Sequence, residues 1–218
     1  MRLTKYFHSC FVLEEGNDRI LFDPGIFSFM EGRIDPNVFR DIQAIFITHN
    51  HSDHIDTEAL KKILANNLGA LIFTNIDTQD VLNKEKIACT IFESGEKKVG
   101  GLRVRAISAD HEQILKPVPK NTAFLVNEAF LVTGDSLSYS LRELKGVKVL
   151  ALPILAPWCK EMEVAEFAQS IQAQYIIPCH DGFVLDMFRE RKYQNWREYF
   201  EGVRIDFRPL EAGEIFEF

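Results

Sequence analysis

Apolar residues occur along the chain in short runs separated by polar turns, a pattern typical of β-strands. Turn-forming residues at 15–18 and the Asp23-Pro24-Gly25 sequence interrupt the first of these runs. The run at residues 44–48 is apolar throughout, as expected for a strand covered on both faces. The pattern predicts strands at residues 2–7, 11–13, 19–22, 44–48, 70–73, 90–92, 102–108, 122–126, 129–133, 147–152 and 175–178.

Two segments instead carry apolar residues at helical spacing. One is predicted to run from residue 57 to 65, with Asp56 or Thr57 as its N-cap, and the other covers about 162–173. Because helices alternate with strands, we expect a layered α/β (α+β) protein. The strand-rich pattern recurs in both halves, which is compatible with two similar sheets packed face to face. A length of 218 residues predicts one domain, 1–218.

The six histidines of the chain are distributed unevenly. Three of them lie in the motif His-x-His-x-Asp-His at residues 49–54, and the others are His8, His111 and His180. This motif has a chance of about 3 in 10,000 of arising anywhere in a sequence of this composition. It directly follows the predicted strand at 44–48, so it lies at the carboxyl end of a buried strand, where sites of α/β proteins form.

The spacing within this motif predicts ligands for more than one ion. In an extended chain His49, His51 and Asp53 share a face, whereas His54 points elsewhere. A rigid loop can therefore present two ligands to one ion and Asp53 and His54 to another. Imidazole and carboxylate groups suit zinc, iron or manganese.

Three further candidates follow predicted strands in the same way. His111 lies in SADHEQ, Asp135 in VTGDS and His180 in IPCHDG. A single histidine at a strand end is usually exposed or hydrogen-bonded, and Asp135 alone reads as a turn residue, so their significance depends on the triple-histidine motif. The complete set has seven members: His49, His51, Asp53, His54, His111, Asp135 and His180. One zinc ion takes about four ligands, so this set predicts two ions that share a carboxylate and a water.

In its order and spacing this ligand series resembles that of the metallo-β-lactamase fold superfamily. The resemblance implies a four-layer αββα sandwich with the metals at one edge. It assigns His49, His51 and His111 to the first ion, places Asp53, His54 and His180 on the second, and makes Asp135 the bridge. Asp23, in ILFDPG, matches the early aspartate that follows the third strand of that superfamily.

A narrower resemblance covers residues 6–25 and 152–182. Both segments are similar to the branch that contains ascorbate-6-phosphate lactonase and the N-acylphosphatidylethanolamine phospholipase D enzymes. That branch usually has glycine where this chain has Phe7, and it often has tyrosine or glycine where this chain has Asp181. The branch contains many uncharacterised hydrolases, so the resemblance defines the fold more closely than the substrate.

The chemistry expected of such a site is hydrolysis. Two close divalent cations lower the pKa of a bridging water from 15.7 toward roughly 7, and the resulting hydroxide attacks a carbonyl carbon or a phosphorus. We therefore expect a metal-dependent hydrolase of a small ester, lactone or phosphoester, with two divalent ions, zinc first and manganese or iron as alternatives. Asp53 is the candidate catalytic residue, because it can orient the nucleophile and move a proton.

Two other residues are predicted to support this site. Asp23 is the candidate acceptor behind the metal-binding histidines, with a purely structural turn as the alternative. His8 is predicted to line the pocket or to contact a ligand, with a surface position at a strand end as the alternative. The sequence leaves the roles of Lys116, Lys120 and Trp158 open.

Composition narrows the classes of function. With 25 Lys and Arg against 32 Asp and Glu, the net charge of −7 argues against a nucleic-acid partner. The partner expected of the metal site is a small-molecule substrate, which can itself be anionic. The alternatives are an RNA-processing nuclease of the same fold and a non-catalytic metal-binding protein. A di-iron oxygen reductase is disfavoured, because that branch carries Glu in place of His51 and a flavin domain. No segment resembles a signal peptide or a membrane span, so a cytoplasmic protein is expected, with its oligomeric state left open.

Overall fold

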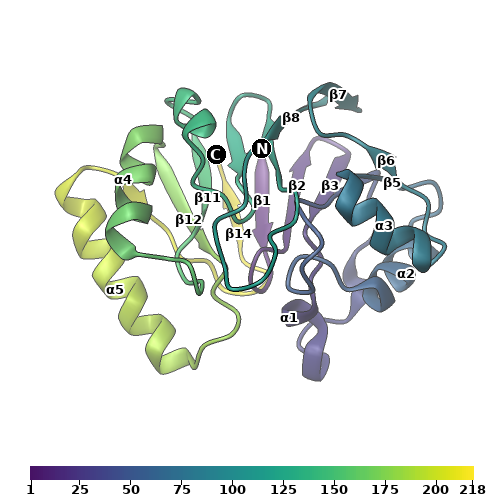
Figure 1. Ribbon diagram of the computed structural model, residues 1–218, viewed down its shortest axis with the longest axis horizontal. Helices are drawn as coiled ribbons and strands as arrows, with labels where there is room; N and C mark the ends of the chain where they lie inside the picture. Colours follow the sequence, from purple (N-terminus) through teal and green to yellow (C-terminus); the bar gives the residue numbers. More distant parts are fainter.

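Two seven-stranded sheets face each other in the computed structural model, which describes residues 1–218 (Figure 1). The first sheet has the spatial order β14 (Ile215–Glu217), β1 (Arg2–Lys5), β2 (Phe11–Glu15), β3 (Asp18–Phe22), β4 (Ala44–Phe46), β5 (Leu71–Thr74) and β6 (Thr90–Ile91). The second has the order β13 (Asp206–Phe207), β12 (Tyr175–Cys179), β11 (Val149–Pro153), β10 (Phe130–Val132), β9 (Thr122–Val126), β8 (Leu102–Ser108) and β7 (Gly95–Val99).

Helices cover the outer face of each sheet. In Figure 1, α2 (Thr57–Asn66) and α3 (Ile76–Lys84) flank the first sheet, and α4 (Glu161–Ile171) and α5 (Asp186–Gly202) flank the second. The short helix α1 (Ile26–Phe29) and three 3₁₀ turns, Met30–Gly32, Pro36–Val38 and Tyr139–Glu143, lie in connecting segments. The predicted four-layer αββα sandwich is therefore confirmed. The helices include none with the length and apolar composition that crossing a membrane requires.

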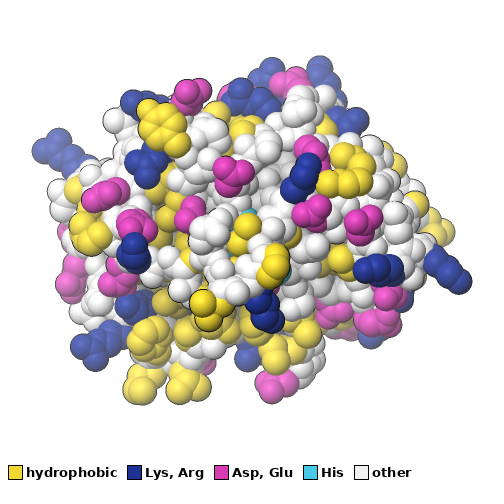
Figure 2. Space-filling view, viewed as in Figure 1, with side chains coloured by type: hydrophobic (Ala, Val, Ile, Leu, Met, Phe, Trp, Pro, Cys, Tyr) yellow, Lys and Arg dark blue, Asp and Glu magenta, His cyan; other side chains and the backbone are white.

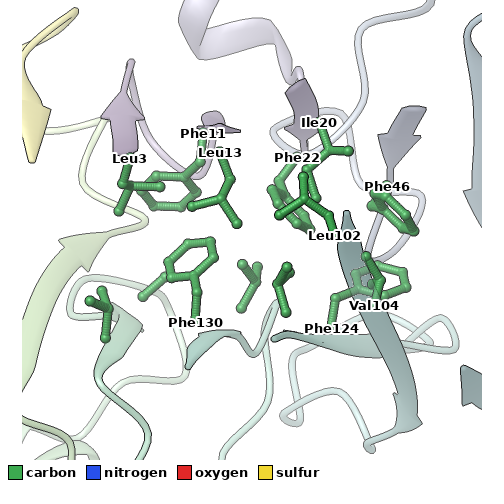
Figure 3. Packing of buried hydrophobic residues seen from close by; sticks show 14 of the residues in the cluster. Leu3, Phe11, Leu13, Ile20, Phe22, Phe46, Leu102, Val104, Phe124 and Phe130 are labelled. Carbon is green, nitrogen blue, oxygen red and sulfur yellow. The ribbon is translucent and has the colours of Figure 1, made fainter. Parts of the chain in front are cut away.

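The core between the sheets is formed by alternate residues of the facing strands. Figure 3 shows side chains from β1–β4 meeting side chains from β8–β10. The Phe46 ring centroid lies 5.2 Å from that of Phe124, and the Phe22 centroid lies 5.9 Å from that of Phe130. Such aromatic pairs contribute about 0.5–1.5 kcal/mol beyond the burial of their area. These contacts hold the two sheets, and hence the loops at their ends, in a fixed relation.

The β4 strand illustrates how the apolar pattern determines burial. Ala44 and Phe46 belong to the core between the sheets, whereas Ile45 packs in the outer cluster that contains Leu60 of α2 and Leu82 of α3. The strand is therefore covered on both faces, as its continuous apolar sequence predicts. The predicted N-cap of α2 is also confirmed, because the Asp56 carboxylate accepts hydrogen bonds from the backbone N–H groups of residues 58 and 59.

Several elements have no counterpart among the predicted ones, namely α1, α3, α5, β7, β13 and β14. The helix α5 is rich in charged residues and buries only Tyr193, Trp196 and Phe200 among its 17 residues. Its apolar stripe is therefore too narrow to stand out in the sequence. The strands β13 and β14 contain two and three residues, which is too short to show an alternating pattern.

Candidate metal centre

Six strands direct their carboxyl ends toward the candidate site. In the first sheet β1, β3 and β4 run in the same direction, and His8, Asp23 and the loop 49–54 follow them. In the second sheet β8, β10 and β12 run in the same direction, and they are followed by the other three candidates, His111, Asp135 and His180. Because strands that run in one direction end at one edge of a sheet, residues far apart in sequence meet there.

All seven predicted ligands converge, together with His8. They form two groups, and within each group the potential ligand atoms lie within 4.8 Å of one another: His49, His51, His111 and Asp135 in one, and His8, Asp53, His54 and His180 in the other. Asp135 also contacts the second group, because its Oδ1 lies 3.2 Å from Nε2 of His54 and its Oδ2 lies 3.2 Å from Nε2 of His180. Asp135 therefore lies between the two groups.

Three nitrogen atoms meet in the first group. Nδ1 of His51 lies 3.2 Å from Nε2 of His49 and 3.3 Å from Nε2 of His111. In the second group, Oδ2 of Asp53 lies 3.3 Å from Nε2 of His180 and 4.0 Å from Nε2 of His54. Each group thus collects imidazole nitrogens and a carboxylate, the donor set that zinc and similar divalent ions accept.

Asp23 determines which nitrogen of two histidines carries the proton. Its Oδ2 accepts a hydrogen bond from the Thr48 hydroxyl at 2.8 Å and lies 2.8 Å from Nδ1 of His54, which must therefore donate to it. Because the Thr48 hydroxyl has used its only hydrogen, Nδ1 of His49 donates to Thr48 Oγ1 at 3.0 Å. In the neutral rings, Nε2 of both histidines consequently carries a lone pair that faces the site.

Backbone carbonyl groups determine the proton position in two more histidines. Nδ1 of His111 lies 2.6 Å from the carbonyl oxygen of Glu112, and Nδ1 of His180 lies 2.5 Å from that of Leu155. A carbonyl can only accept, so both Nδ1 atoms carry the hydrogen and both Nε2 atoms are available as ligands.

Unpartnered buried atoms lie at the centre of this arrangement. Three buried atoms have no hydrogen-bond partner, namely Nε2 of His54, Nε2 of His180 and Oδ1 of Asp135. This holds even though Nε2 of His54 lies 3.2 Å from Oδ1 of Asp135. A buried polar atom without a partner costs about 1–3 kcal/mol. A cation between these atoms would satisfy all three, so the residues fit a metal ion.

The charges of the centre require compensation. Burial by itself lowers the pKa of His180, but the negative charge of Asp135 and the hydrogen bonds to Asp135 and Asp53 together outweigh burial and raise this pKa to about 9. The pKa of His54 is likewise raised, because Asp135 and Asp23 outweigh the effect of burial. The pKa of Asp135 is well below its ordinary value, since His180 and His54 outweigh burial there. Ionised carboxylates therefore attract protons or metal ions to the same positions.

Sequence reasoning left several neighbours of the site unidentified or without a role. Trp158, whose role was open, donates from Nε1 to Oδ2 of Asp135 at 3.2 Å. Of the two loop lysines, Lys116 is exposed and Lys120 pairs with Glu93 at 3.5 Å. Thr48 carried no sequence signal, because one hydroxyl beside a histidine is common in any protein.

A buried ionic cluster behind His180 was also missed. Lys5 lies 2.7 Å from Oδ2 of Asp181, and the Tyr193 hydroxyl donates to the same oxygen. These three side chains connect β1, the loop after β12 and helix α5. The unusual Asp181 beside His180 was the only signal in the sequence, and its partner Lys5 lies 176 positions away.

Comparison with known proteins agrees with this architecture. Residues 2–180 match the family described as Beta-lactamase superfamily domain. The chain is 32% identical over 192 residues to Protein Rv0786c of Mycobacterium tuberculosis, which covers 84% of this chain and 85% of that protein. It is 26% identical over 239 residues to a UPF0173 metal-dependent hydrolase of Aeropyrum pernix, which covers 100% of this chain and 97% of the relative.

A solved structure has the same fold. Igni18, described as a metallo hydrolase from the hyperthermophilic archaeon Ignicoccus hospitalis, superposes with a TM-score of 0.74 at 24% identity. The superposition covers 100% of this chain and 98% of the other. The family match extends through β12 to His180, and so includes every strand end that supplies a candidate residue. On these grounds the resemblance inferred from the sequence is confirmed, and the chain belongs to the beta-lactamase superfamily.

Proposed function

We propose that this chain is a metal-dependent hydrolase with two divalent ions, which cleaves a small ester, lactone or phosphoester. The observation that carries the proposal is the position of Asp135 between two clusters of histidine nitrogens, with buried atoms that lack any other partner. Membership of the superfamily and relatives named metal-dependent hydrolases support the same activity.

The ligands of the two ions follow from the two groups. His49, His51 and His111 would hold the first ion, and the second would be held by Asp53, His54 and His180. The Asp135 carboxylate faces both sets. When bound, the ions would make water nucleophilic at neutral pH and polarise the oxygen of the bond to be cleaved.

The residues of the chain itself would orient the reaction. The side chain of Asp53 is 22% exposed, whereas those of His54 and Asp135 are almost fully buried, so Asp53 is the carboxylate that substrate and water can reach. Its position beside His180 suits a group that orients the attacking water and accepts its proton. Trp158 donates to Asp135 and would hold that carboxylate in its orientation between the ions.

Aromatic rings border the centre and suit the non-reacting part of a substrate. The Phe183 ring is 43% exposed and lies 5.7 Å from the His180 ring, and the Phe27 ring lies 6.0 Å from that of Phe183. Figure 2 shows hydrophobic side chains along the lower edge of the molecule, where Figure 1 places α1 and the start of α5. A small substrate with an apolar substituent therefore fits the surroundings better than a strongly charged one.

The test combines metal analysis with a substrate screen. Purified protein should contain about two ions per chain after reconstitution with zinc or manganese, and it should hydrolyse at least one chromogenic ester, lactone or phosphodiester. Chelation should abolish turnover, and added metal should restore it. Protein that binds no metal after reconstitution, or that is equally active without metal, would contradict the proposal.

A matched pair of variants links activity to the centre. Asp135→Asn should lose metal and turnover, because the amide cannot serve two ions as an anionic oxygen can. Asp110→Asn makes the same chemical change at an exposed residue next to His111 and should behave as wild type. Cleavage of RNA without hydrolysis of any of the small chromogenic substrates would instead support the nuclease alternative. Metal binding without turnover of any substrate would support the non-catalytic one.

A further inference from the structure

His8 is a buried histidine of the second group that the proposed ligand set does not use. It follows strand β1, is 1% exposed, and has a φ of 61°, in the left-handed region that few residues other than glycine adopt. Its ring centroid lies 5.0 Å from that of Phe27 and 4.1 Å from that of His180. A strained backbone with a buried polar side chain indicates a role other than packing.

The hydrogen bonds of His8 differ from those of the other buried histidines of the centre. The backbone N–H of Gly182 donates to Nδ1 of His8 at 3.1 Å, so this nitrogen must carry a lone pair. The single hydrogen of the neutral ring is therefore on Nε2, which lies 3.2 Å from Oδ2 of Asp53. In His49, His54, His111 and His180 the hydrogen is on Nδ1 instead.

The Gly182 contact depends on the absence of a side chain. A Cβ atom at this position would lie 3.1 Å from Cβ of His8, 3.2 Å from Cβ of Phe27 and 3.3 Å from Nδ1 of His8. These distances are shorter than ordinary van der Waals contacts. Glycine thus lets the loop after His180 approach closely enough for its N–H to reach the imidazole.

We propose that His8 is a positioning residue, whose Nε2–H holds Oδ2 of Asp53 in the orientation required for the second ion. The same oxygen faces Nε2 of His180, so the hydrogen bond keeps the carboxylate directed at the other ligands of that ion. His8 cannot itself ligate through Nε2, since that nitrogen has no free lone pair. The inference rests on the proposed two-ion function and names the residue that orders the Asp53 carboxylate in it.

Two variants distinguish this role from ligation and from packing. His8→Phe keeps a ring of similar size but removes the donor, whereas His8→Gln places an amide N–H near the position of Nε2. We expect His8→Phe to lower the affinity for the second ion by about 10- to 100-fold and to leave the affinity for the first ion unchanged. A titration with cobalt(II), monitored by the absorption spectrum of the bound ion, measures both affinities. His8→Gln should restore most of that affinity. Phe27→Leu, which disturbs packing around His8 but keeps its N–H, should bind both ions as wild type does.

A measurement on the wild-type protein tests the proton position directly. Long-range ¹H–¹⁵N correlation spectra distinguish the two neutral forms of each histidine, and we expect His8 to carry its hydrogen on Nε2 while His54 and His180 carry theirs on Nδ1 in the metal-loaded protein. Three results would each overturn the proposal. They are a hydrogen on Nδ1 of His8, a wild-type affinity for the second ion in His8→Phe, and an equal loss of that affinity in His8→Phe and His8→Gln. A wild-type protein that binds fewer than two ions would instead reject the proposed function, and the spectrum of metal-free protein would still test the His8 hydrogen bond.

Discussion

Replacement of Asp23 by asparagine tests whether one buried carboxylate prepares His54 and His49 as ligands. Asp23 is completely buried, and its two oxygens accept three hydrogen bonds of 2.8 Å, from the Thr48 N–H, the Thr48 hydroxyl and Nδ1 of His54. The substitution changes no volume of consequence but converts one oxygen into a donor. The expected cost depends on which oxygen is replaced.

The structure bounds this cost in either orientation of the amide. If the amide nitrogen faces the Thr48 N–H, two donors oppose each other, and the unsatisfied group lowers the free energy of unfolding by about 1–3 kcal/mol. If it faces His54, the ring must accept at Nδ1 and carry its hydrogen on Nε2, which removes a metal ligand. The affinity for the second ion should then fall by about 10- to 100-fold, equivalent to about 1.4–2.7 kcal/mol.

Two assays measure these outcomes in the same preparations. Competition with a chromogenic chelator gives the affinity of each ion, and urea denaturation of the metal-free protein gives the free energy of unfolding. Asp110→Asn, the same change at an exposed position, is the control and should alter neither quantity. If Asp23→Asn also matches wild type in both assays, the assignment of the His54 and His49 protons to Nδ1 is wrong.

Three further predictions concern proton release on metal binding, the Lys5–Asp181 pair and His51. Metal binding at pH 7 should release at least two protons, because His54 and His180 have raised pKa values and must lose a proton to ligate. The proton released by His180 should no longer be observed as the pH rises through about 9. Calorimetry in buffers of different ionisation enthalpy measures the number of protons released. A number that does not change with pH would contradict the raised pKa of His180. Lys5→Met should lower the free energy of unfolding by about 3–5 kcal/mol in urea denaturation, since Asp181 loses its buried cation; a change below about 1 kcal/mol would show the pair to be unimportant. Burial raises the pKa of Asp181, but the Lys5 charge and the hydrogen bonds from Lys5 and Tyr193 together outweigh burial, so the net pKa is lowered. The stability from this cluster should therefore be present above pH 4 and be lost as the pH falls below about 4. His51→Ala should lose both metal and hydrolysis, as measured by metal analysis and the substrate screen, and full retained activity would refute its place in the site.

Much of the layered architecture was predictable because apolar alternation is a local property. The strand at 44–46 and the helix at 57–66 agree with the sequence-based expectation to within two residues, and Asp56 caps the helix as predicted. Helix α5 was not predictable in this way, because its few buried aromatic residues are separated by charged ones. Its position depends on the surface that the second sheet offers, which does not exist until that sheet has formed.

The candidate ligands were predictable for a different reason. His49, His51, Asp53 and His54 are close in sequence, and strand ends are recognisable from the apolar runs that precede them. The distant members could be named only because the local motif required partners. Their convergence, with Asp135 between two groups of nitrogens, depends on the direction and order of strands in two sheets.

Sequence by itself determined the residue types at the centre, the strands that carry them and the family resemblance that groups them. Only the tertiary structure decided which nitrogen of His8, His54 and His180 carries a hydrogen, because that depends on hydrogen-bonding groups contributed by distant segments, a donor for His8 and acceptors for the other two. Leu155 faces His180, Asp23 faces His54, and Gly182 faces His8 from 174 positions away. In these three histidines the proton position is set by a partner that folding brings within about 3 Å, and no local pattern of residues encodes that partner.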